Sequence, residues 1–152
     1  SLIATSARYG ARFAGAPLEV EEALTRYGEK IGSAFQLSDD ILDIASESAE
    51  SGKTPGTDLR EGIPTLPVLL ARRSADPADA RLLELLDADL SDDALHAEAL
   101  DLLRKHPAMD EARAYVLERA REAQELLTVL PEASPVRAAL DAFAEVVATR
   151  TA

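Results

Sequence analysis

Three aspartates stand within five residues of one another in the segment FQLSDDILD, at positions Asp39, Asp40 and Asp43. Like charges this close repel one another, and Asp is a poor helix former, so the cluster costs stability unless something relieves it. Carboxylate oxygens suit Mg²⁺, which is typically bound by one or two carboxylates together with substrate phosphates. The cluster is therefore either a solvated acidic face or a cation site.

A lysine follows this cluster at a distance that a phosphate site could use. Lys53 comes ten residues after Asp43, in the segment GKTPGTDL, whose Gly and Pro residues predict a loop. A Lys side chain on such a loop can contact a phosphate as a point charge. The segment lacks the GxxxxGK(S/T) pattern and a preceding strand, which disfavours a nucleotide-binding P-loop. The combination favours a diphosphate, with metal ions joining it to the aspartates and the lysine balancing its charge.

The elements that carry these residues are predicted to be helices. Apolar residues recur at helical spacing along the whole chain, and no segment shows the alternation typical of strands. Cap residues and prolines mark several helix starts, as at Asp76 before Pro77 and Ser134 before Pro135. We expect helices over about 1–14, 18–47, 64–73, 78–87, 91–105, 108–130 and 134–149. The predicted fold class is therefore all-α, a helical bundle or part of one, with one long loop at 46–64.

On a helical wheel, the predicted helix 18–47 keeps its acidic residues away from its apolar side. The apolar side consists of Val20, Leu24, Tyr27, Ile31, Ala34, Phe35, Ile41, Leu42 and Ala45. The polar side consists of Gly32, Gln36, Asp39, Asp40 and Asp43, within an arc of roughly 100° that contains no Lys or Arg. Gly32 should leave space beside this arc, and the wheel predicts that the three aspartates share one face.

Composition limits the classes of protein to consider. The 152 residues include 28 Asp and Glu against 16 Lys and Arg, and the net charge of −12 opposes nucleic-acid binding. There is no cysteine, which excludes disulfides and thiolate metal sites and fits a reducing compartment. No apolar run is long enough to cross a membrane. Met109 is the only methionine and the sequence opens within a helical pattern, so we expect a piece of a longer protein.

Other polar residues are predicted to be structural. His96 and His106 are ten residues apart in a polar stretch, which predicts surface or helix-end histidines and no zinc site. The Asp92–Asp93 pair lacks the FQ context and the lysine loop, and it is typical of a helix start. The leucine- and alanine-rich stripes after residue 78 predict helix packing and carry no further site.

Together, the acidic helix and the lysine loop resemble the C-terminal half of trans-isoprenyl (polyprenyl) diphosphate synthases. The second aspartate-rich motif of that family reads FQxxDDxxD, and it is matched by Phe35, Gln36, Asp39, Asp40 and Asp43. The family segment GK…GxDL…TLP is matched by Gly52, Lys53, Gly56, Asp58, Leu59, Thr65, Leu66 and Pro67. The opening SLIATSARYGARFAG resembles the sequence that follows the family's Lys-Thr motif. The resemblance implies that residues 1–152 are the C-terminal half of one synthase domain, without the N-terminal half that carries the first aspartate-rich motif.

This resemblance implies the isoprenoid synthase fold and a prenyltransferase activity. Such enzymes join isopentenyl diphosphate to an allylic diphosphate and release a longer trans-polyprenyl diphosphate. The allylic C–O bond ionises, the double bond of isopentenyl diphosphate attacks the cation, and a proton leaves. Mg²⁺, with Mn²⁺ as a substitute, and basic side chains stabilise the departing pyrophosphate. The resemblance also implies a cytoplasmic homodimer.

The resemblance also assigns catalytic and binding roles. Asp39 is the implied direct Mg²⁺ ligand, and Asp40 and Asp43 act as ligands or through metal-bound water. Lys53 would contact the allylic diphosphate, and Gln36 would lie close to the reacting prenyl chain.

Two further residues keep two interpretations each. Phe35 would line the substrate pocket, or its wheel position would bury it in the core. Asp58 would belong to the substrate site, or it would brace the loop through backbone hydrogen bonds.

The match to the family has two departures, and two other functions stay open. The first aspartate-rich motif is missing from these residues, as are the Arg and Lys residues that bind isopentenyl diphosphate in the family. Many members carry a second Lys five residues after the aspartate matched by Asp58, and here Ile63 stands at that position. The form GKxxGxDLxxG is similar to that of longer-chain bacterial synthases, including those that make menaquinone side chains. One alternative is a non-catalytic helical subunit or packing module of a heteromeric synthase, which would not need intact aspartates. A terpene cyclase of the same broad fold is the other, and the lysine loop argues against it.

Overall fold

The computed structural model describes residues 1–46 and 54–150, and every element in these ranges is a helix. The predicted all-α class is therefore confirmed for the described residues. Two compact units can be distinguished: unit 1 contains Ser1–Ser38 and Tyr115–Arg150, and unit 2 contains Asp39–Ala114. Helices α2 (Leu18–Ala45) and α7 (Ala108–Leu126) contribute residues to both units. Within the described ranges, no helix has the length and apolar character needed to span a membrane.

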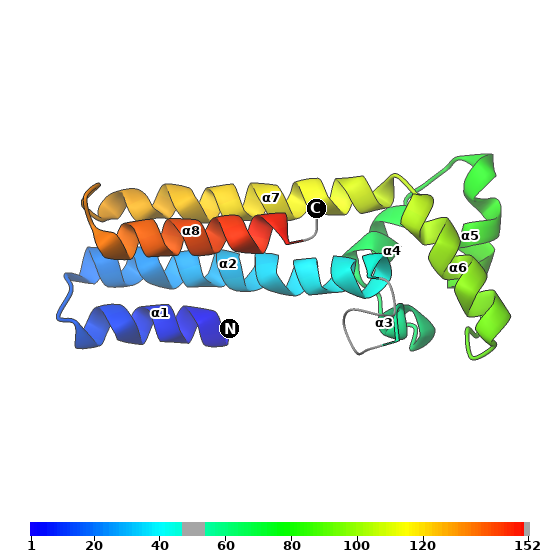
Figure 1. Cartoon of the computed structure of the whole chain (residues 1–152), viewed down its shortest axis with the longest axis horizontal. Helices are drawn as coiled ribbons and strands as arrows, with labels where there is room; N and C mark the ends of the chain where they lie inside the picture. The colour runs from blue at the N-terminus through cyan, green and yellow to red at the C-terminus, as the bar shows by residue number, and fades with distance from the viewer. Residues whose placement is uncertain (47–53, 151–152) are drawn as a thin grey trace. The chain divides into compact units, whose positions relative to one another are not determined.

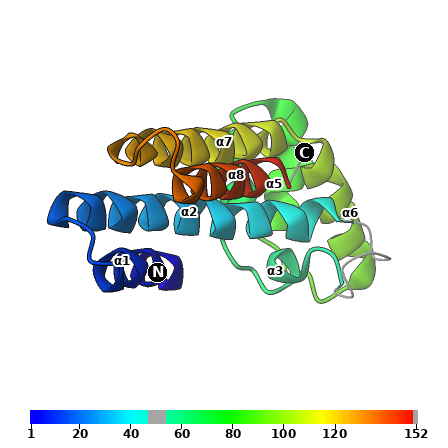
Figure 2. The same ribbon diagram turned by 60° about the vertical axis from the view of Figure 1, so that its left-hand side comes forward.

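Unit 1 is built from helices that lie alongside one another. It combines α1 (Leu2–Phe13) and α8 (Pro135–Thr149) with most of α2 and α7, and the 3₁₀ turn η2 (Leu127–Val129) follows α7 (Figure 1). The view turned by 60° shows the same side-by-side arrangement of α1, α2, α7 and α8 (Figure 2). The buried core includes Leu24, Tyr27, Ile31, Ala34, Val116, Ala120, Ala123, Leu127, Ala144 and Val147. Burial of these apolar side chains is the main source of stability in such a bundle.

Small residues allow α1 to approach α2 closely. A Cβ atom added to Gly28 would lie 2.6 Å from the Cα of Ala4, which is a backbone atom that cannot rotate away. Gly32 is also covered, since a Cβ there would lie 2.5 Å from the Oγ of Ser1. The space that the sequence places beside the acidic arc is therefore occupied by the start of α1.

Unit 2 is organised around α6 (Asp93–Lys105). This helix contacts α3 (Thr57–Arg60), α4 (Leu66–Ala71) and α5 (Ala80–Leu86). The 3₁₀ turn η1 (Pro77–Asp79) leads into α5. The buried core of this unit includes Ile41, Ile44, Leu59, Val68, Leu82, Leu85, Leu90, Ala99, Leu100, Leu103, Met109 and Ala112.

The cap residues explain why most helix starts were predictable. Asp76 accepts a hydrogen bond from the backbone N–H of Ala78, and Ser134 accepts one from Arg137. Asp92 accepts from Ala94 and Leu95, as expected of a helix start. These side chains satisfy N–H groups that have no partner within their own helix.

The region 46–64, predicted as one loop, contains the short helix α3 between Thr57 and Arg60. The prediction of an uninterrupted loop was therefore wrong, and residues 47–53 lie outside the described residues. The N-cap of α3 is Gly56, which has φ 71° and no side chain that could cap. A local sequence signal for this helix is accordingly weak, because its cap comes from elsewhere in the chain.

Candidate functional site

The aspartates of the acidic cluster differ in exposure. Asp39 is exposed, while Asp40 and Asp43 are half-buried near the C-terminal end of α2. All three lie in unit 2. The same helix carries the half-buried Phe35 and the exposed Gln36, which belong to unit 1.

Asp43 caps helix α3 from a distance in the sequence. Its Oδ1 accepts the N–H of Thr57 at 3.2 Å, and its Oδ2 accepts the N–H of Asp58 at 3.1 Å. Its backbone carbonyl accepts the N–H of Gly56 at 2.7 Å. The carboxylate thus supplies the N-terminal cap that Gly56 cannot supply. As a result, the orientation of Asp43 is fixed by the backbone of α3.

Asp40 makes a similar but longer contact with the start of α4. Its Oδ2 accepts the N–H of Leu66 at 3.4 Å, and the N-cap of that helix, Thr65, makes no side-chain cap of its own. The hydroxyl of Thr65 is buried with no hydrogen-bond partner in the structure. Two members of the aspartate cluster therefore hold two short helices, α3 within the region predicted as a loop and α4 just after it.

The remaining predicted site residues fall into different settings. Asp58 is half-buried in the first turn of α3, and its backbone donates to Asp43 and accepts from the N–H of Ile63 at 2.9 Å. Both bonds use the backbone of Asp58, so the two interpretations of its side chain stay predictions. Lys53 lies outside the described residues, so its predicted phosphate contact stays a prediction.

Phe35 is neither a fully buried core residue nor a fully exposed residue of a pocket wall. It is half-buried, and the guanidinium of Arg150 lies over its ring, 4.0 Å from the centroid. Arg150 also donates to the carbonyl of Phe35 at 2.7 Å and to the hydroxyl of Ser38 at 2.6 Å. The prediction of core burial for Phe35 was wrong, because a cation from the end of α8 covers the ring instead.

Sequence reasoning missed Ser38, which is completely buried within the FQLSDD segment. Its hydroxyl donates to the carbonyl of Phe35 at 2.9 Å while accepting from Arg150. A buried hydroxyl requires such partners, but the arginine is more than one hundred residues away in the sequence. No local pattern could have linked the two residues.

His96 was predicted as a surface or helix-end residue, and the surface assignment was wrong. Only 5% of its surface is exposed, and its ring contacts the carbonyl of Gly56 and the guanidinium of Arg60.

His106, by contrast, is the C-terminal cap of α6, as a helix-end histidine should be. Its Nδ1 accepts the N–H of Ala108, so its Nε2 donates to Asp79 at 3.0 Å. Hydrogen bonds from Ser74 and His106 lower the pKa of the Asp79 carboxyl.

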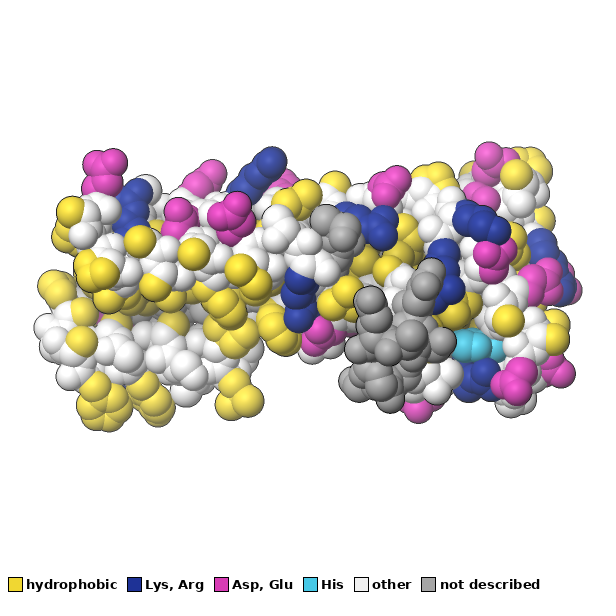
Figure 3. All heavy atoms as spheres, in the orientation of Figure 1, with side chains coloured by type: hydrophobic (Ala, Val, Ile, Leu, Met, Phe, Trp, Pro, Cys, Tyr) yellow, Lys and Arg dark blue, Asp and Glu magenta, His cyan; other side chains and the backbone are white. Residues whose placement is uncertain are grey.

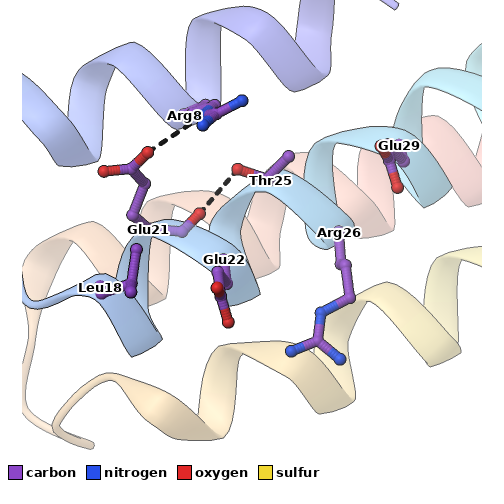
Figure 4. Close-up of a pocket in the computed structure, with 7 residues that line it drawn as sticks. All are labelled: Arg8, Leu18, Glu21, Glu22, Thr25, Arg26 and Glu29. Atoms are coloured by element: carbon purple, nitrogen blue, oxygen red, sulfur yellow. Dashed lines mark hydrogen bonds and ion pairs between the residues drawn. The ribbon is translucent and has the colours of Figure 1, made fainter.

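A separate hollow of about 300 Å³ lies where α1 meets α2 in unit 1 (Figure 4). Figure 4 shows Arg8 of α1 turned toward Glu21 of α2, and their closest atoms are 3.0 Å apart. Glu21 is buried and also pairs with Arg12 at 3.5 Å. The charges at this hollow therefore join two helices, and the hollow lacks a surplus of basic groups that would favour a phosphate.

The described residues allow only certain kinds of metal binding. Among them, no three His, Asp or Glu side chains are gathered closely enough to form a protein cage for an ion. Asp39, Asp40 and Asp43 offer only oxygen ligands, the hard kind that suits Mg²⁺. Mg²⁺ commonly keeps several waters and takes one or two carboxylates. The donor set therefore fits a hydrated Mg²⁺ that a diphosphate helps to hold.

Comparison with known proteins agrees with the motif. Residues 1–103 match the sequence profile of the polyprenyl synthetase family. The chain is 47% identical over 150 residues to the nonaprenyl diphosphate synthase of Mycobacterium tuberculosis, an alignment that covers 99% of this chain and 44% of that protein.

Two solved structures are similar to it along almost its whole length. One is a geranylgeranyl pyrophosphate synthase from Corynebacterium glutamicum, with a TM-score of 0.88 and 39% identity. The other is a polyprenyl synthase from Caulobacter crescentus, with a TM-score of 0.87 and 34% identity. Both were solved in complex with calcium and isoprenyl diphosphate, and each match covers 99% of this chain and 46% of the other chain. The chain thus spans less than half the length of these relatives.

Proposed function

Because the chain belongs to the polyprenyl synthetase family, we propose that it provides a metal-binding and diphosphate-binding face of a trans-prenyltransferase. The reaction would condense isopentenyl diphosphate with an allylic diphosphate to give a longer trans-polyprenyl diphosphate. The observation that carries the proposal is the arrangement at the end of α2, where Asp39 is exposed and the backbone of α3 and α4 holds Asp43 and Asp40. A packing module without catalysis would still use Asp43 and Asp40 to hold α3 and α4, so the exposed Asp39 is the residue that separates the two functions.

The proposed roles of the aspartates follow from their contacts. Asp39 would bind Mg²⁺, or Mn²⁺ in its place, and Asp40 and Asp43 would ligate or act through metal-bound water. Two related structures were solved in complex with calcium and isoprenyl diphosphate, which supports a divalent ion and a diphosphate as ligands of the proposed enzyme. When bound, the ion would supply positive charge that stabilises the departing pyrophosphate.

The other site residues would act on the substrate. We assign Lys53 to the allylic diphosphate, and Gln36, which is exposed on α2, to the prenyl chain. Phe35, whose ring Arg150 covers, would help to shape the wall of the substrate pocket, and Asp58 would contribute from the first turn of α3, whose N–H groups bond to Asp43. From the family resemblance alone we also propose a cytoplasmic homodimer for the whole enzyme.

The chain would be the C-terminal half of a synthase domain. Unit 1 exposes a stripe on α1, where Leu2 is 87% and Phe13 is 86% exposed, and one on α8, where Val146 is 62% exposed. In the space-filling view, hydrophobic side chains gather over α1 and α8 (Figure 3). Apolar surface of this extent usually marks an interface. We propose that the half of the domain that the relatives possess and this chain lacks covers these stripes.

Calorimetry with inorganic pyrophosphate and Mg²⁺ tests this function on the chain itself. We expect Mg²⁺-dependent binding that Asp39→Asn weakens by tenfold or more, because a metal ligand is lost. Asp101→Asn is the matched control, since it removes the same charge from an exposed ion pair with Lys105 elsewhere in unit 2. Absence of Mg²⁺-dependent binding, or equal losses in both variants, would overturn the assignment.

A further inference from the structure

Helix α6 supports the acidic end of α2 through Arg104. The Nε of Arg104 donates to the carbonyl of Ile44 and its Nη2 to the carbonyl of Ser46, each at 2.6 Å. The last turn of α2 contains no basic residue, although Asp43 lies in it and Asp39 and Asp40 come just before it, and its final carbonyls have no partners within the helix. A cation is favourable at a helix C-terminus. Arg104 therefore supplies the positive charge and the donors that the sequence of α2 lacks.

The same helix holds the start of α3 through His96. The Nε2 of this buried ring lies 2.8 Å from the carbonyl oxygen of Gly56, and its Nδ1 lies 3.1 Å from Nη2 of Arg60. A guanidinium can only donate, so Nδ1 accepts and the proton is on Nε2. His96 accordingly donates to Gly56. Arg60 is itself anchored by Asp93 at 2.8 Å and by the carbonyl of Ser91 at 3.1 Å.

Gly56 fits this contact because it has no side chain. Its φ of 71° lies in the left-handed region, which other residues rarely adopt. A Cβ atom would lie 2.8 Å from Nε2 of His96 and 3.0 Å from Cδ1 of Leu100. The carbonyl that His96 holds is therefore part of a tight junction between α6 and the α3 turn.

The junction extends to the aspartate cluster. Gly56, Thr57 and Asp58 donate three consecutive backbone N–H groups to Asp43, the first to its carbonyl and the others to its carboxylate. A restraint on the Gly56 carbonyl is thus a restraint on the N–H groups that orient the Asp43 carboxylate.

We propose that His96 and Arg104 of α6 are positioning residues for the aspartate-rich end of α2. Arg104 fixes the end of the helix, and His96 fixes the turn that orients the carboxylate of Asp43. The two residues are eight positions apart, about two helical turns, so one rigid helix restrains both places. The consequence for ligand binding rests on the proposed diphosphate function, whereas the positioning contact stands on the geometry.

Two amide substitutions at position 96 test whether the hydrogen bond to the Gly56 carbonyl is needed or whether any polar side chain suffices. The Nε2 of a Gln side chain reaches about as far as Nε2 of His and can donate to Gly56, whereas Asn ends near the position of Nδ1 and cannot. We expect His96→Asn to speed amide hydrogen exchange at Gly56, Thr57 and Asp58 by about tenfold, and His96→Gln to preserve protection. In calorimetry with Mg²⁺ and inorganic pyrophosphate, His96→Asn should weaken binding several-fold and His96→Gln should restore it.

A control histidine distinguishes local from global effects. His106→Asn removes the contact with Asp79 and should leave both exchange at residues 56–58 and pyrophosphate binding unchanged. Unchanged exchange in His96→Asn would overturn the proposal, and so would faster exchange with undiminished pyrophosphate affinity. If the unmodified chain bound no pyrophosphate, the proposed function would fail, and the exchange data alone would decide whether His96 orients Asp43.

Arg104 is tested in the same way at the end of α2. Arg104→Gln should speed exchange at the N–H of Ser46, which bonds to the carbonyl of Leu42 in the last turn. Lys105→Gln is the neighbouring control, because Lys105 pairs with Asp101 on the same helix. Equal exchange in the two variants would remove Arg104 from the proposal.

Discussion

Asp40 and Asp43 show how a helix can tolerate an acidic cluster near its C-terminal end. Their mutual repulsion is offset partly by the backbone N–H groups of Leu66, Thr57 and Asp58. Hydrogen bonds to a charged acceptor are roughly twice as strong as those between neutral groups. The carboxylates of Asp40 and Asp43 therefore serve the fold as well as the proposed site. At the scale of single residues, structure and proposed function use the same atoms.

The titration of Tyr27 should be visible as a change in the free energy of unfolding with pH. Burial, with a contribution from Asp141, raises its pKa to about 12, and its hydroxyl donates to the carbonyl of Leu140 at 2.6 Å. In the unfolded chain the pKa should be near 10. The folded state binds the proton more tightly, so this contribution is complete below pH 10 and disappears as the pH rises through 12. We expect the free energy of unfolding to lose roughly 2 kcal/mol over this interval.

The measurement compares urea unfolding of the unmodified chain and Tyr27→Phe at several pH values. The variant lacks the hydroxyl and should be less stable by about 1 kcal/mol or more at pH 8. The difference between the two proteins should shrink above pH 10, and a gap of about 1 kcal/mol should reverse in sign by about pH 12, because the titration of Tyr27 removes roughly 2 kcal/mol from the unmodified chain alone. A difference that stays constant over that range would show that Tyr27 titrates equally in the folded and unfolded states.

At the scale of elements, the sequence predicted those helices whose signals are local. The starts of α6, α8 and η1 carry their own caps in Asp92, Ser134 and Asp76, so spacing and cap residues sufficed. Helix α3 escaped prediction because its cap is Asp43, on another helix. The burial of His96 depends on that same docking.

The site itself was predictable in part. The wheel placed the three aspartates on one helix, and they do lie together at the end of α2. It could not show that Phe35 and Ser38 contact Arg150, because that contact joins residues more than one hundred positions apart in the sequence. Their roles toward metal and substrate, and the role of Lys53, stay predictions.

The close approach of α1 to α2 gives a matched pair of glycine substitutions. Gly10→Ala meets no atom within 4 Å and should stabilise the protein by up to about 1 kcal/mol, because Ala is the better helix former. Gly28→Ala gains the same propensity but drives Cβ against the backbone of Ala4 at 2.6 Å. We expect a net loss of about 1–3 kcal/mol, typical of overpacking. Urea unfolding measures both changes, and equal stabilisation by the two would contradict the close crossing of the helices.

At the scale of the whole molecule, unit 1 exposes apolar stripes and the chain spans less than half the length of its relatives. The stripe on α1 includes Leu2, Tyr9 and Phe13. The rings of Tyr9 and Phe13 meet edge to face, with their centroids 6.0 Å apart. The stripe on α8 includes Val136, Phe143 and Val146, all at helical spacing. Since the alignment covers 44% of the mycobacterial nonaprenyl diphosphate synthase, that relative contains additional chain that could cover such surface.

We therefore expect the chain to be inactive alone and active when joined to a complementary half. The uncovered portion of the Mycobacterium tuberculosis relative is a suitable partner, since the two proteins are 47% identical where they align. Co-expression should give a co-eluting complex that condenses labelled allylic diphosphate with isopentenyl diphosphate in the presence of Mg²⁺. Phe13→Asp and Val146→Asp place a charge in the proposed interface and should weaken complex formation by tenfold or more.

Ala138→Asp provides the control for this interface, because it adds the same charge to an exposed position of α8 about 80° or more away from the stripe. It should leave both the complex and its turnover intact. Condensation by the isolated chain would contradict the half-domain proposal while leaving the aspartate site possible. Equal losses from Ala138→Asp and Val146→Asp would show that α8 does not present one specific face to the partner. In the assembled complex, substitution of Asp39, Asp40 or Asp43 should abolish turnover and leave complex formation intact. That result would show that the stripes assemble the domain and that the end of α2 supplies part of its chemistry.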